Sequence, residues 1–598
     1  MHKYDNQLED FFGMGSGGGG RSDDRESIKE VLARKLPLKS RLRLLPKVLS
    51  RTERYLVLWC TLLFVGALAS VPFTTYWHYT ESVPSSGGRL VEGILGEPRL
   101  VNPLLSQTND ADRDLASLVF SGLYRINGDG KLVPDLAKTM PEITSDGLSY
   151  SVTIRDDARW HDGVPVTADD IVFTVQAAQN PDYGAVSTVR GNWQGVTAER
   201  VSDRVVIFKL KAKYAQFPNN LTLGIIPQHL WADIKPINFS LSELNIKPVG
   251  SGPYRFKSLT KNDTGRVHSY RLQAWTQYYG GRPYIDELEF RFFGSEDELI
   301  EAFNTNKIDN IGYLSGSNVS RLKFRNRINL EQLKMPRYFA LFFNQNQSKA
   351  LSDKNVRLAL NYATDRIQII NQNLDGNAFL INSPMMGGIL DINPAVRTYD
   401  YDLDQAKSVL KAGGWTANDA GIPAKNKDTA LELKITTSTW PELTAVAQQV
   451  KEQWEKLGAK VTVEAVPISQ LQTIIKERNY QILLFGEIMS LDPDPYTLWH
   501  SSQRQEPGLN LALYKNDTAD KLLEEARQTL NPLERMQKYD EFQKVLIEDI
   551  PAVFLYSPHY LYGLDERVHG FNTTLISMPA DRFANIATWY LNTSRRFK

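Results

Sequence analysis

Acidic side chains gather in one short stretch of the chain. Asp492-Pro493-Asp494-Pro495 places two carboxylates two positions apart, and Glu487 precedes them. Carboxylates at such spacing serve acid–base catalysis or calcium coordination. Each aspartate also precedes a proline, which favours extended backbone. Three interpretations follow: a structural loop, a ligand contact, or a metal or catalytic site.

Other sequence patterns that carry enzyme chemistry are absent. None of the eight histidines begins a His-Glu-x-x-His motif, and there is no Gly-x-Ser-x-Gly nucleophile motif. The glycine-rich stretch Pro248–Tyr254 lacks the Lys-Ser/Thr of a phosphate loop and suits a rigid turn. His161-Asp162 has the residue types of an acid–base pair, but the surrounding residues predict a tight turn. The sequence therefore predicts no catalytic residue, no metal site and no cofactor.

Composition sets wider limits on the class of protein. The chain has 598 residues, 42% of them hydrophobic, which is enough for several domains with buried cores. Lys and Arg together number 69, as do Asp and Glu, so net charge gives no reason to expect a nucleic-acid partner. The single cysteine, Cys60, excludes an intrachain disulfide and a cysteine metal cluster.

The first 54 residues differ in character from the rest. Residues 1–28 are polar and end in a glycine run, which predicts a disordered tail. Residues 29–54 carry many Lys and Arg with leucines between them. Such a segment is either a short amphipathic helix on anionic lipid or a charged flank beside a membrane span.

Residues 55–79 contain no Asp, Glu, Lys or Arg, with aromatic residues near both ends, and predict a single transmembrane helix. A signal peptide fits less well because the apolar core is long and starts late in the chain. A lipid anchor at Cys60 fits less well because bulky Trp59 precedes it. The positive charges before the span predict a cytoplasmic N-terminus and a large outer domain. Residues 80–88 are rich in Ser and Gly and predict a flexible linker.

The outer part has an α/β pattern. Alternating apolar residues predict strands at 89–94, 150–154, 205–210, 431–436, 460–466 and 480–485. Apolar spacing of three and four predicts helices at 110–121, 355–371, 403–412, 441–457 and 517–529. The strand–helix–strand order of the second half favours a parallel sheet with helices on its faces.

The most specific stretch is Trp160–Thr174, which reads WHDGVPVTADDIVFT. It predicts a Gly-Pro turn followed by a helix with Thr167 as N-cap and two aspartates in its first turn. It resembles the Trp-x-Asp-Gly-x-Pro-x-Thr-Ala-x-Asp signature of the extracytoplasmic solute-binding proteins of family 5, which serve dipeptide, oligopeptide and nickel ABC importers. Further similar stretches follow in the family's order over about residues 89–598: Pro248–Tyr254, Asn355–Arg366, Asp404–Trp415, Asp492–Pro495 and Asp549–Tyr556.

This resemblance implies a two-lobed, periplasmic-binding-protein-like fold of type II with an extra subdomain. By analogy, the first lobe takes residues 89–335 and 560–598, with 126–247 as the extra subdomain, and the second lobe takes 336–559. The stretch Pro248–Tyr254 is where the family's chain is expected to cross between lobes. Closure of the lobes around a ligand requires contacts that are better in the closed state.

The resemblance also implies site residues. In some peptide-binding members an aspartate just before the Asp-Pro motif pairs with the ligand's free amine, and Met489 stands at that place here. Either Glu487 takes the amine through a shifted loop, or the ligand has no free amine. Trp440 at a helix start could stack on a ligand, and Asn102 lies in a segment similar to the family's early cleft segment. The candidate ligand-binding residues are Asn102, Tyr338, Trp440, Glu487, Met489 and Asp492.

Three functions remain in view. The first is the solute-binding component of an ABC importer that captures a peptide or similar solute and presents it to permease subunits, held beside them by the lipid bilayer. The second is a membrane-anchored receptor of the same fold without transport. The third, an outward-facing hydrolase, is disfavoured because the sequence has no nucleophile–base motif. The ligand could be a peptide, a nickel complex or a sugar.

Overall fold

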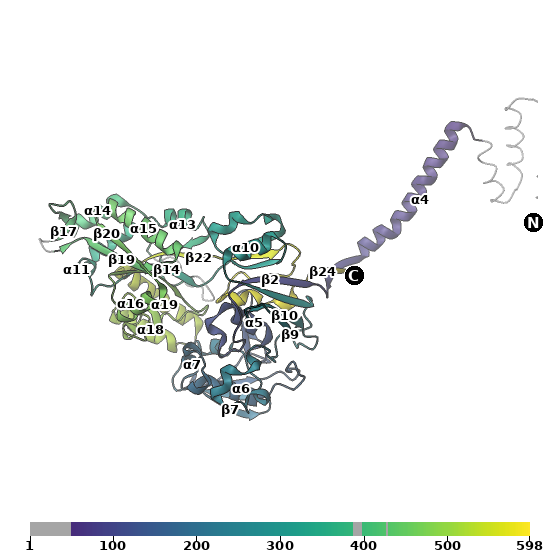
Figure 1. Cartoon of the computed structure of the whole chain (residues 1–598), viewed down its shortest axis with the longest axis horizontal. Helices are drawn as coiled ribbons and strands as arrows, with labels where there is room; N and C mark the ends of the chain where they lie inside the picture. Colours follow the sequence, from purple (N-terminus) through teal and green to yellow (C-terminus); the bar gives the residue numbers. More distant parts are fainter. Residues whose placement is uncertain (1–48, 387–396, 426–428) are drawn as a thin grey trace, which may run out of the picture. The chain divides into compact units, whose positions relative to one another are not determined.

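The computed structural model describes residues 49–386, 397–425 and 429–598 (Figure 1). The predicted disordered tail and nearly all of the basic segment before the apolar helix lie outside these residues. The described chain forms two compact units. One holds the residues up to Val83 together with Thr593–Lys598, and the other holds Pro84–Asn592.

The smaller unit is built on one long helix, α4 (Arg51–Tyr79). Ser50 caps its N-terminus with Glu53 in a reciprocal capping box, and none of its residues is buried. Within the described residues it is the one helix long and apolar enough to cross a membrane. The predicted linker begins not as a loop but as strand β1 (Thr80–Ser85), which pairs with β24 (Asn592–Phe597).

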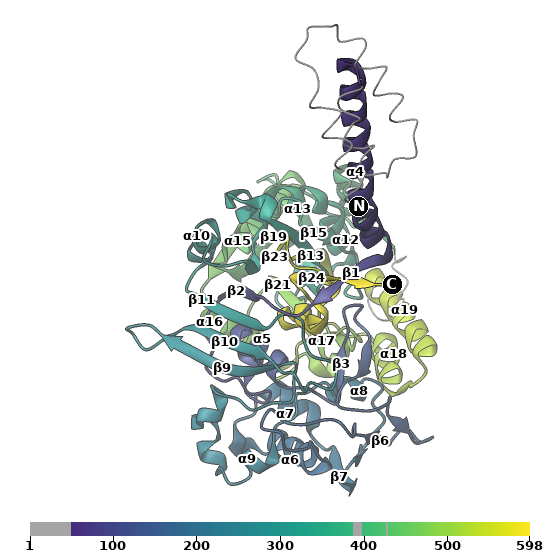
Figure 2. The same ribbon diagram turned by 90° about the vertical axis from the view of Figure 1, so that its right-hand side faces the viewer.

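The larger unit has two lobes, each built on one mixed sheet (Figures 1 and 2). The first lobe has a seven-stranded sheet in which β2 lies between two parallel neighbours and the outer strands pair antiparallel. Its strands in order are β13 (Ile328–Leu333), β23 (Tyr560–Asp565), β12 (Asn310–Leu314), β2 (Arg89–Leu95), β11 (Glu287–Phe293), β10 (Val267–Ala274) and β9 (Tyr254–Lys261). Helices α5 (Asp110–Val119) and α10 (Glu296–Asn304) pack against this sheet.

A smaller four-stranded antiparallel sheet follows α5 in the chain. Its strands in order are β5 (Glu142–Ile143), β6 (Ser149–Thr153), β8 (Val205–Lys209) and β7 (Thr197–Ser202). Helix α6 (Ala168–Gln179) packs against β7 and β8, and α7 (Ser187–Trp193) packs against α6. The strands predicted at 150–154 and 205–210 are both confirmed within one residue of their observed ends.

The signature stretch forms a turn held by buried hydrogen bonds. Thr167 caps α6, as predicted, and its backbone N–H donates to the Asp170 carboxylate (2.8 Å). The other carboxylate oxygen accepts the backbone N–H of Gln228 (2.8 Å). The indole N–H of Trp160 also donates to Asp170 (3.3 Å). One aspartate therefore fixes the helix start, the turn before it and a distant segment.

His161 serves the same turn and not a catalytic pair. Its Nδ1 accepts the backbone N–H of Gly250 (3.2 Å), and its Nε2 lies 3.0 Å from the carbonyl of Gly252. Burial lowers the pKa of His161 to about 4. Asp162 pairs with His229 instead (2.8 Å). The prediction of a tight turn is confirmed.

Gly250 explains why the Pro248–Tyr254 stretch is rich in glycine. A Cβ on Gly250 would lie 1.9 Å from the carbonyl oxygen of Val119, so only glycine fits against α5. The stretch leads into β9 of the seven-stranded sheet. The expectation that the chain crosses between lobes here is wrong, because these residues remain packed against the first lobe.

The second lobe has a six-stranded sheet. Its strands in order are β15 (Ala378–Leu380), β22 (Ala552–Pro558), β14 (Arg337–Phe343), β21 (Ile482–Ile488), β19 (Glu432–Ser438) and β20 (Lys460–Val466). Its longer helices are α12 (Lys354–Tyr362), α13 (Arg366–Asn373), α14 (Leu403–Ala412), α15 (Pro441–Lys456), α16 (Ile468–Glu477), α18 (Asp517–Gln528) and α19 (Pro532–Asp549). The three strands β20, β19 and β21 pair in parallel, which confirms the predicted parallel arrangement for this part of the sheet. The sheet as a whole is mixed, because β14 pairs antiparallel with β21 and with the late strand β22.

The single helix predicted at 355–371 is also wrong. The chain breaks between α12 and α13, where the Asp365 side chain accepts the backbone N–H of Gln368 (2.9 Å) and caps a new helix. Arg366 is buried there and donates to the carbonyl of Phe554 on β22 (2.7 Å). The break therefore lets the buried guanidinium of Arg366 donate a hydrogen bond to strand β22.

Two short connections join the lobes. Lys334–Pro336 lies between β13 and β14, and His559 lies between β22 and β23. In each lobe the two strands that meet these connections pair with each other: β13 with β23, and β14 with β22. A two-strand hinge of this kind lets the lobes move relative to each other with few changed backbone angles.

Candidate ligand-binding site

A cavity of about 230 Å³ lies at the hinge, and we call it the hinge cavity. It is lined by the connection Lys334–Pro336, by residues 379–386 and by residues after β21. Its wall carries four methionines, Met335, Met385, Met386 and Met489. Within the described residues, Lys334 is its one charged side chain. Unbranched thioethers adapt to apolar groups of different shape.

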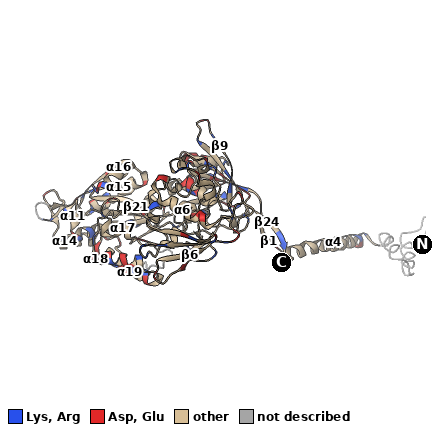
Figure 3. Cartoon of the chain, turned by 90° about the horizontal axis from the view of Figure 1, so that it is seen from below, with Lys and Arg blue, Asp and Glu red and all other residues tan. Residues whose placement is uncertain are grey.

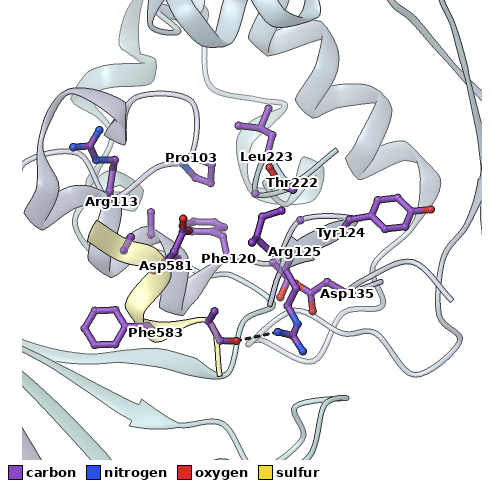
Figure 4. A pocket seen from close by; sticks show the side chains of 18 of the residues that line it. Pro103, Arg113, Phe120, Tyr124, Arg125, Asp135, Thr222, Leu223, Asp581 and Phe583 are labelled. Carbon is purple, nitrogen blue, oxygen red and sulfur yellow. Dashed lines mark hydrogen bonds between the residues drawn. The ribbon is translucent and has the colours of Figure 1, made fainter. Parts of the chain in front are cut away.

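A larger cavity of about 530 Å³ lies in the first lobe (Figure 4), and we call it the first-lobe cavity. Its lining carries charged and amide side chains, including Arg113, Arg125, Asp135, Asn219 and Asp581. One chain segment contributes to both cavities: Leu575 lines the hinge cavity, and Ser577 lines the first-lobe cavity.

Charges of both signs line the first-lobe cavity. Arg125 donates to the carbonyl of Ala584 (2.9 Å; Figure 4), which leaves part of its guanidinium uncommitted. Asp135 accepts the hydroxyl of Tyr279 (2.5 Å), and burial raises the pKa of its carboxyl. Arg113 has a buried Nε without a hydrogen-bond partner among the described residues. A lining with both arginine and aspartate side chains can bind the carboxylate and the ammonium group of a zwitterionic solute.

The lobes also meet beside these cavities. Asn219, which lines the first-lobe cavity, donates its amide to Asp492 of the second lobe (3.1 Å). Gln216 donates to the carbonyl of Pro493 (3.2 Å), and Pro493 lines the hinge cavity. Tyr214 lies with its hydroxyl 3.5 Å from Asp494. Residues 214–219 of the first lobe therefore contact residues 492–494 of the second lobe.

Asp492 and Asp494 are both used in these contacts. Asp492 pairs with buried Arg535 (3.2 Å), and Asp494 pairs with Arg527 (2.8 Å). Burial raises the pKa of the Asp492 carboxyl, and Arg535 opposes this rise. Of the three interpretations of this stretch, the geometry favours a structural loop that joins the lobes. Whether Asp492 also contacts a ligand stays a prediction.

Glu487 and Tyr338 are brought together. They face each other in the β14–β21 register, and the Tyr338 hydroxyl donates to Oε2 of Glu487. Oε1 of Glu487 is buried and has no partner in the described part of the chain. Burial is the main cause that raises the pKa of Glu487 to about 8. The pair is a carboxyl group with one oxygen free to accept a bond.

The other candidates occupy separate places. Met489 lines the hinge cavity, and its backbone N–H donates to the carbonyl of Pro336 (2.8 Å). Asn102 is fully buried and bonds Asn245 (3.1 Å), one residue before Pro103 in the first-lobe cavity. Trp440 is 39% exposed at the start of α15 and lies 6.0 Å from the ring of Phe339. Of the six candidates, Met489 alone is part of a described cavity lining.

Sequence reasoning missed most of the lining. Arg113 and Asp581 are far apart in the chain, and neither stands in a motif. Three of the four hinge-cavity methionines were likewise not singled out, although the Met385-Met386 pair beside a hinge is a signal that could have drawn notice. Arg113 and Asp581 line the same cavity because the C-terminal segment returns to the first lobe.

Comparison with known proteins decides the family. Residues 131–510 match the model of the bacterial extracellular solute-binding proteins, family 5 Middle. The chain belongs to this family. It is a solute-binding protein of the kind that serves ABC importers, not an enzyme, and it acts outside the cytoplasm.

Relatives agree over nearly the whole larger unit. The oligopeptide-binding protein AppA of Bacillus subtilis is 30% identical over 521 residues, which cover 85% of this chain and 92% of AppA. The structure of AppA in complex with a nonapeptide matches with a TM-score of 0.66 and 28% identity, over 85% of this chain and 100% of that one. NikZ of Campylobacter jejuni in complex with Ni(L-His) matches with a TM-score of 0.69 and 27% identity, over 84% of this chain and 99% of that one. The two-lobed fold is therefore confirmed.

Proposed function

We propose that this solute-binding protein captures peptides and presents them to the permease of an ABC importer. The observation that carries the proposal is the presence of two cavities, one at the hinge and one in the first lobe. The first-lobe cavity has cationic and anionic side chains for the charged and amide groups of a peptide. The hinge cavity has methionines for an apolar side chain. AppA, the relative described above, binds a nonapeptide.

We propose further that α4 is a permanent membrane anchor with residues 1–54 in the cytoplasm. Its apolar length supports a span, and the many Lys and Arg before it support this orientation. Confinement to the membrane plane gives the binding domain a high local concentration beside a permease. A chain cleaved after α4, as after a signal peptide, would contradict this part of the proposal.

Thermal unfolding of the full chain in detergent tests the ligand class. We expect short peptides to raise the melting temperature, because a ligand at 100 times its Kd stabilises the folded state by about 2.7 kcal/mol. Ni(L-His) and a set of monosaccharides form the comparison arms. A shift with Ni(L-His) or a sugar and none with peptides would replace the peptide proposal. The receptor alternative predicts the same binding. It predicts no uptake of labelled peptide by cells that carry the chain together with the permease of an ABC importer.

A further inference from the structure

The C-terminal strand is attached to the outer end of α4. Arg595 on β24 lies with its guanidinium carbon 3.7 Å from the ring centroid of Trp77. It donates to the Thr80 hydroxyl (2.8 Å) and to the carbonyls of Trp77 (3.2 Å) and Thr80 (3.1 Å). Carbonyls in the last turn of a helix have no partner within the helix. Arg595 therefore caps α4 and holds β24 against it.

Aromatic side chains surround this contact. Tyr76, Trp77 and Tyr79 are exposed on the last turn of α4, and Phe597 of β24 is 71% exposed. Phe597 packs edge-to-face on Tyr76, with ring centroids 6.5 Å apart. Exposed tyrosine and tryptophan at the end of an apolar helix are typical of the lipid headgroup level. β24 therefore adds a fourth aromatic residue to this level.

Two further cations stand beside Arg595: Arg596 on β24, and Lys598 directly after the strand. Arg596 and Lys598 are exposed, and no carboxylate pairs with either among the described residues. The backbone N–H of Lys598 donates to the carbonyl of Tyr79 (2.9 Å), so its side chain starts at the helix end. Glu81 is the one acidic residue in β1 and β24. Figure 3 shows the blue of Lys and Arg on β24, next to the mostly tan helix α4.

We propose that the outer end of α4 and β24 form a binding surface for anionic phospholipid headgroups, with Arg596 and Lys598 bonding the lipid phosphate. The proposal rests on the proposed membrane anchor. Arg595 holds the strand, the aromatic residues enter the headgroup layer, and Arg596 and Lys598 supply positive charge at the same level. Each cation near an anionic surface strengthens binding about fivefold.

Titration of lipid onto the full chain tests this surface. The chain is purified in an uncharged detergent, and bound phosphatidylglycerol or phosphatidylcholine is counted by native mass spectrometry. In the double variant Arg596→Ala/Lys598→Ala, we expect the Kd for phosphatidylglycerol to rise about 25-fold. The Kd for phosphatidylcholine should rise much less, because its choline group offsets the charge of its phosphate. Arg595, which caps the helix, is left in place. The matched control is Lys407→Ala/Lys411→Ala, which removes two exposed lysines of α14 and should change neither Kd.

Two outcomes separate failure of this surface from failure of the anchor. An unchanged Kd for phosphatidylglycerol in Arg596→Ala/Lys598→Ala, with the chain retained in membranes after an alkaline carbonate wash, overturns the lipid surface alone. Release of the native chain by the wash overturns the anchor and the lipid surface with it. The basic residues before α4 are the same in every variant, so their own lipid contacts cancel in the comparison.

Discussion

Two acidic regions on the same segment behave differently. Asp492 and Asp494 are each paired with an arginine and touch residues of the opposite lobe. Glu487, only five residues earlier, bonds a single tyrosine hydroxyl and keeps one buried oxygen without a partner in the described chain. The two aspartates form ion pairs inside the second lobe and also contact first-lobe side chains, whereas burial without an ion pair raises the pKa of Glu487. Position in the sequence alone does not separate these two uses.

Breaking the paired region should have the largest effect. Asp492→Ala leaves Arg535 buried without its carboxylate and removes the contact with Asn219. We expect a loss of about 3–5 kcal/mol in the free energy of unfolding, because an unpaired buried charge is costly. Urea unfolding of the full chain in detergent measures it. A loss below about 1 kcal/mol would mean that Arg535 finds other partners and that this ion pair does not organise the junction.

Asp494→Ala should cost less. Its partner Arg527 keeps 31% of its side chain exposed and lies 4.2 Å from the ring centroid of Tyr496. Solvent and the aromatic ring therefore still accommodate the guanidinium. We expect a loss of about 1–2 kcal/mol in the same urea measurement. A larger loss for Asp494→Ala than for Asp492→Ala would reverse the order that burial predicts.

Glu487 should reveal itself through the pH dependence of the free energy of unfolding. Its pKa is about 8 in the folded chain and has an ordinary value of 4.5. A raised pKa means that the folded state binds the extra proton, so the contribution to stability is complete below pH 4.5 and is lost as pH rises toward 8. Each pH unit in that window is worth at most about 1.4 kcal/mol. Glu487→Gln, which resembles the neutral form, should match the native chain near pH 4 and exceed it at pH 8.5.

The control for this pH profile is Glu477→Gln, an exposed glutamate on α16. Melting temperatures of the three proteins from pH 4 to pH 9 suffice. Parallel curves for the native chain and Glu487→Gln would show that Glu487 is ionised in the folded state. In that case Glu487 would be charged in the folded chain, as the arginine-paired Asp492 and Asp494 are, and the contrast between the two acidic regions would be wrong.

Much of the architecture could be predicted from sequence. The spacing of apolar residues and the capping residues predict single elements well. The predicted helix 403–412 and strand 460–466 have the observed bounds, and Thr167 caps α6. Sheet order was not predictable, because β22 and β23 join the two sheets through pairing over hundreds of residues. The break at Asp365 was missed because the apolar spacing continues through it, while a buried arginine contact decides the geometry.

The site was harder to predict than the fold. Met489 was found through a resemblance, and it lines the hinge cavity. Arg113, Asp135 and Asp581 were not found, because single charged residues carry no period or spacing. Their meeting depends on the return of residues 577–588 to the first lobe. Burial of Glu487 likewise follows from the neighbours of β21 in a sheet whose order the sequence does not reveal.

Peptide affinity of a blocked cavity tests the central claim most directly. Leu223 lines the first-lobe cavity, and Leu223→Trp would fill part of it. Leu241 is 79% exposed, so Leu241→Trp is the matched control. Titration calorimetry with one stabilising peptide should give a Kd about 5- to 150-fold weaker for Leu223→Trp, because overfilling costs about 1–3 kcal/mol, and an unchanged Kd for Leu241→Trp. Equal Kd values for Leu223→Trp and the native chain would contradict peptide binding in this cavity.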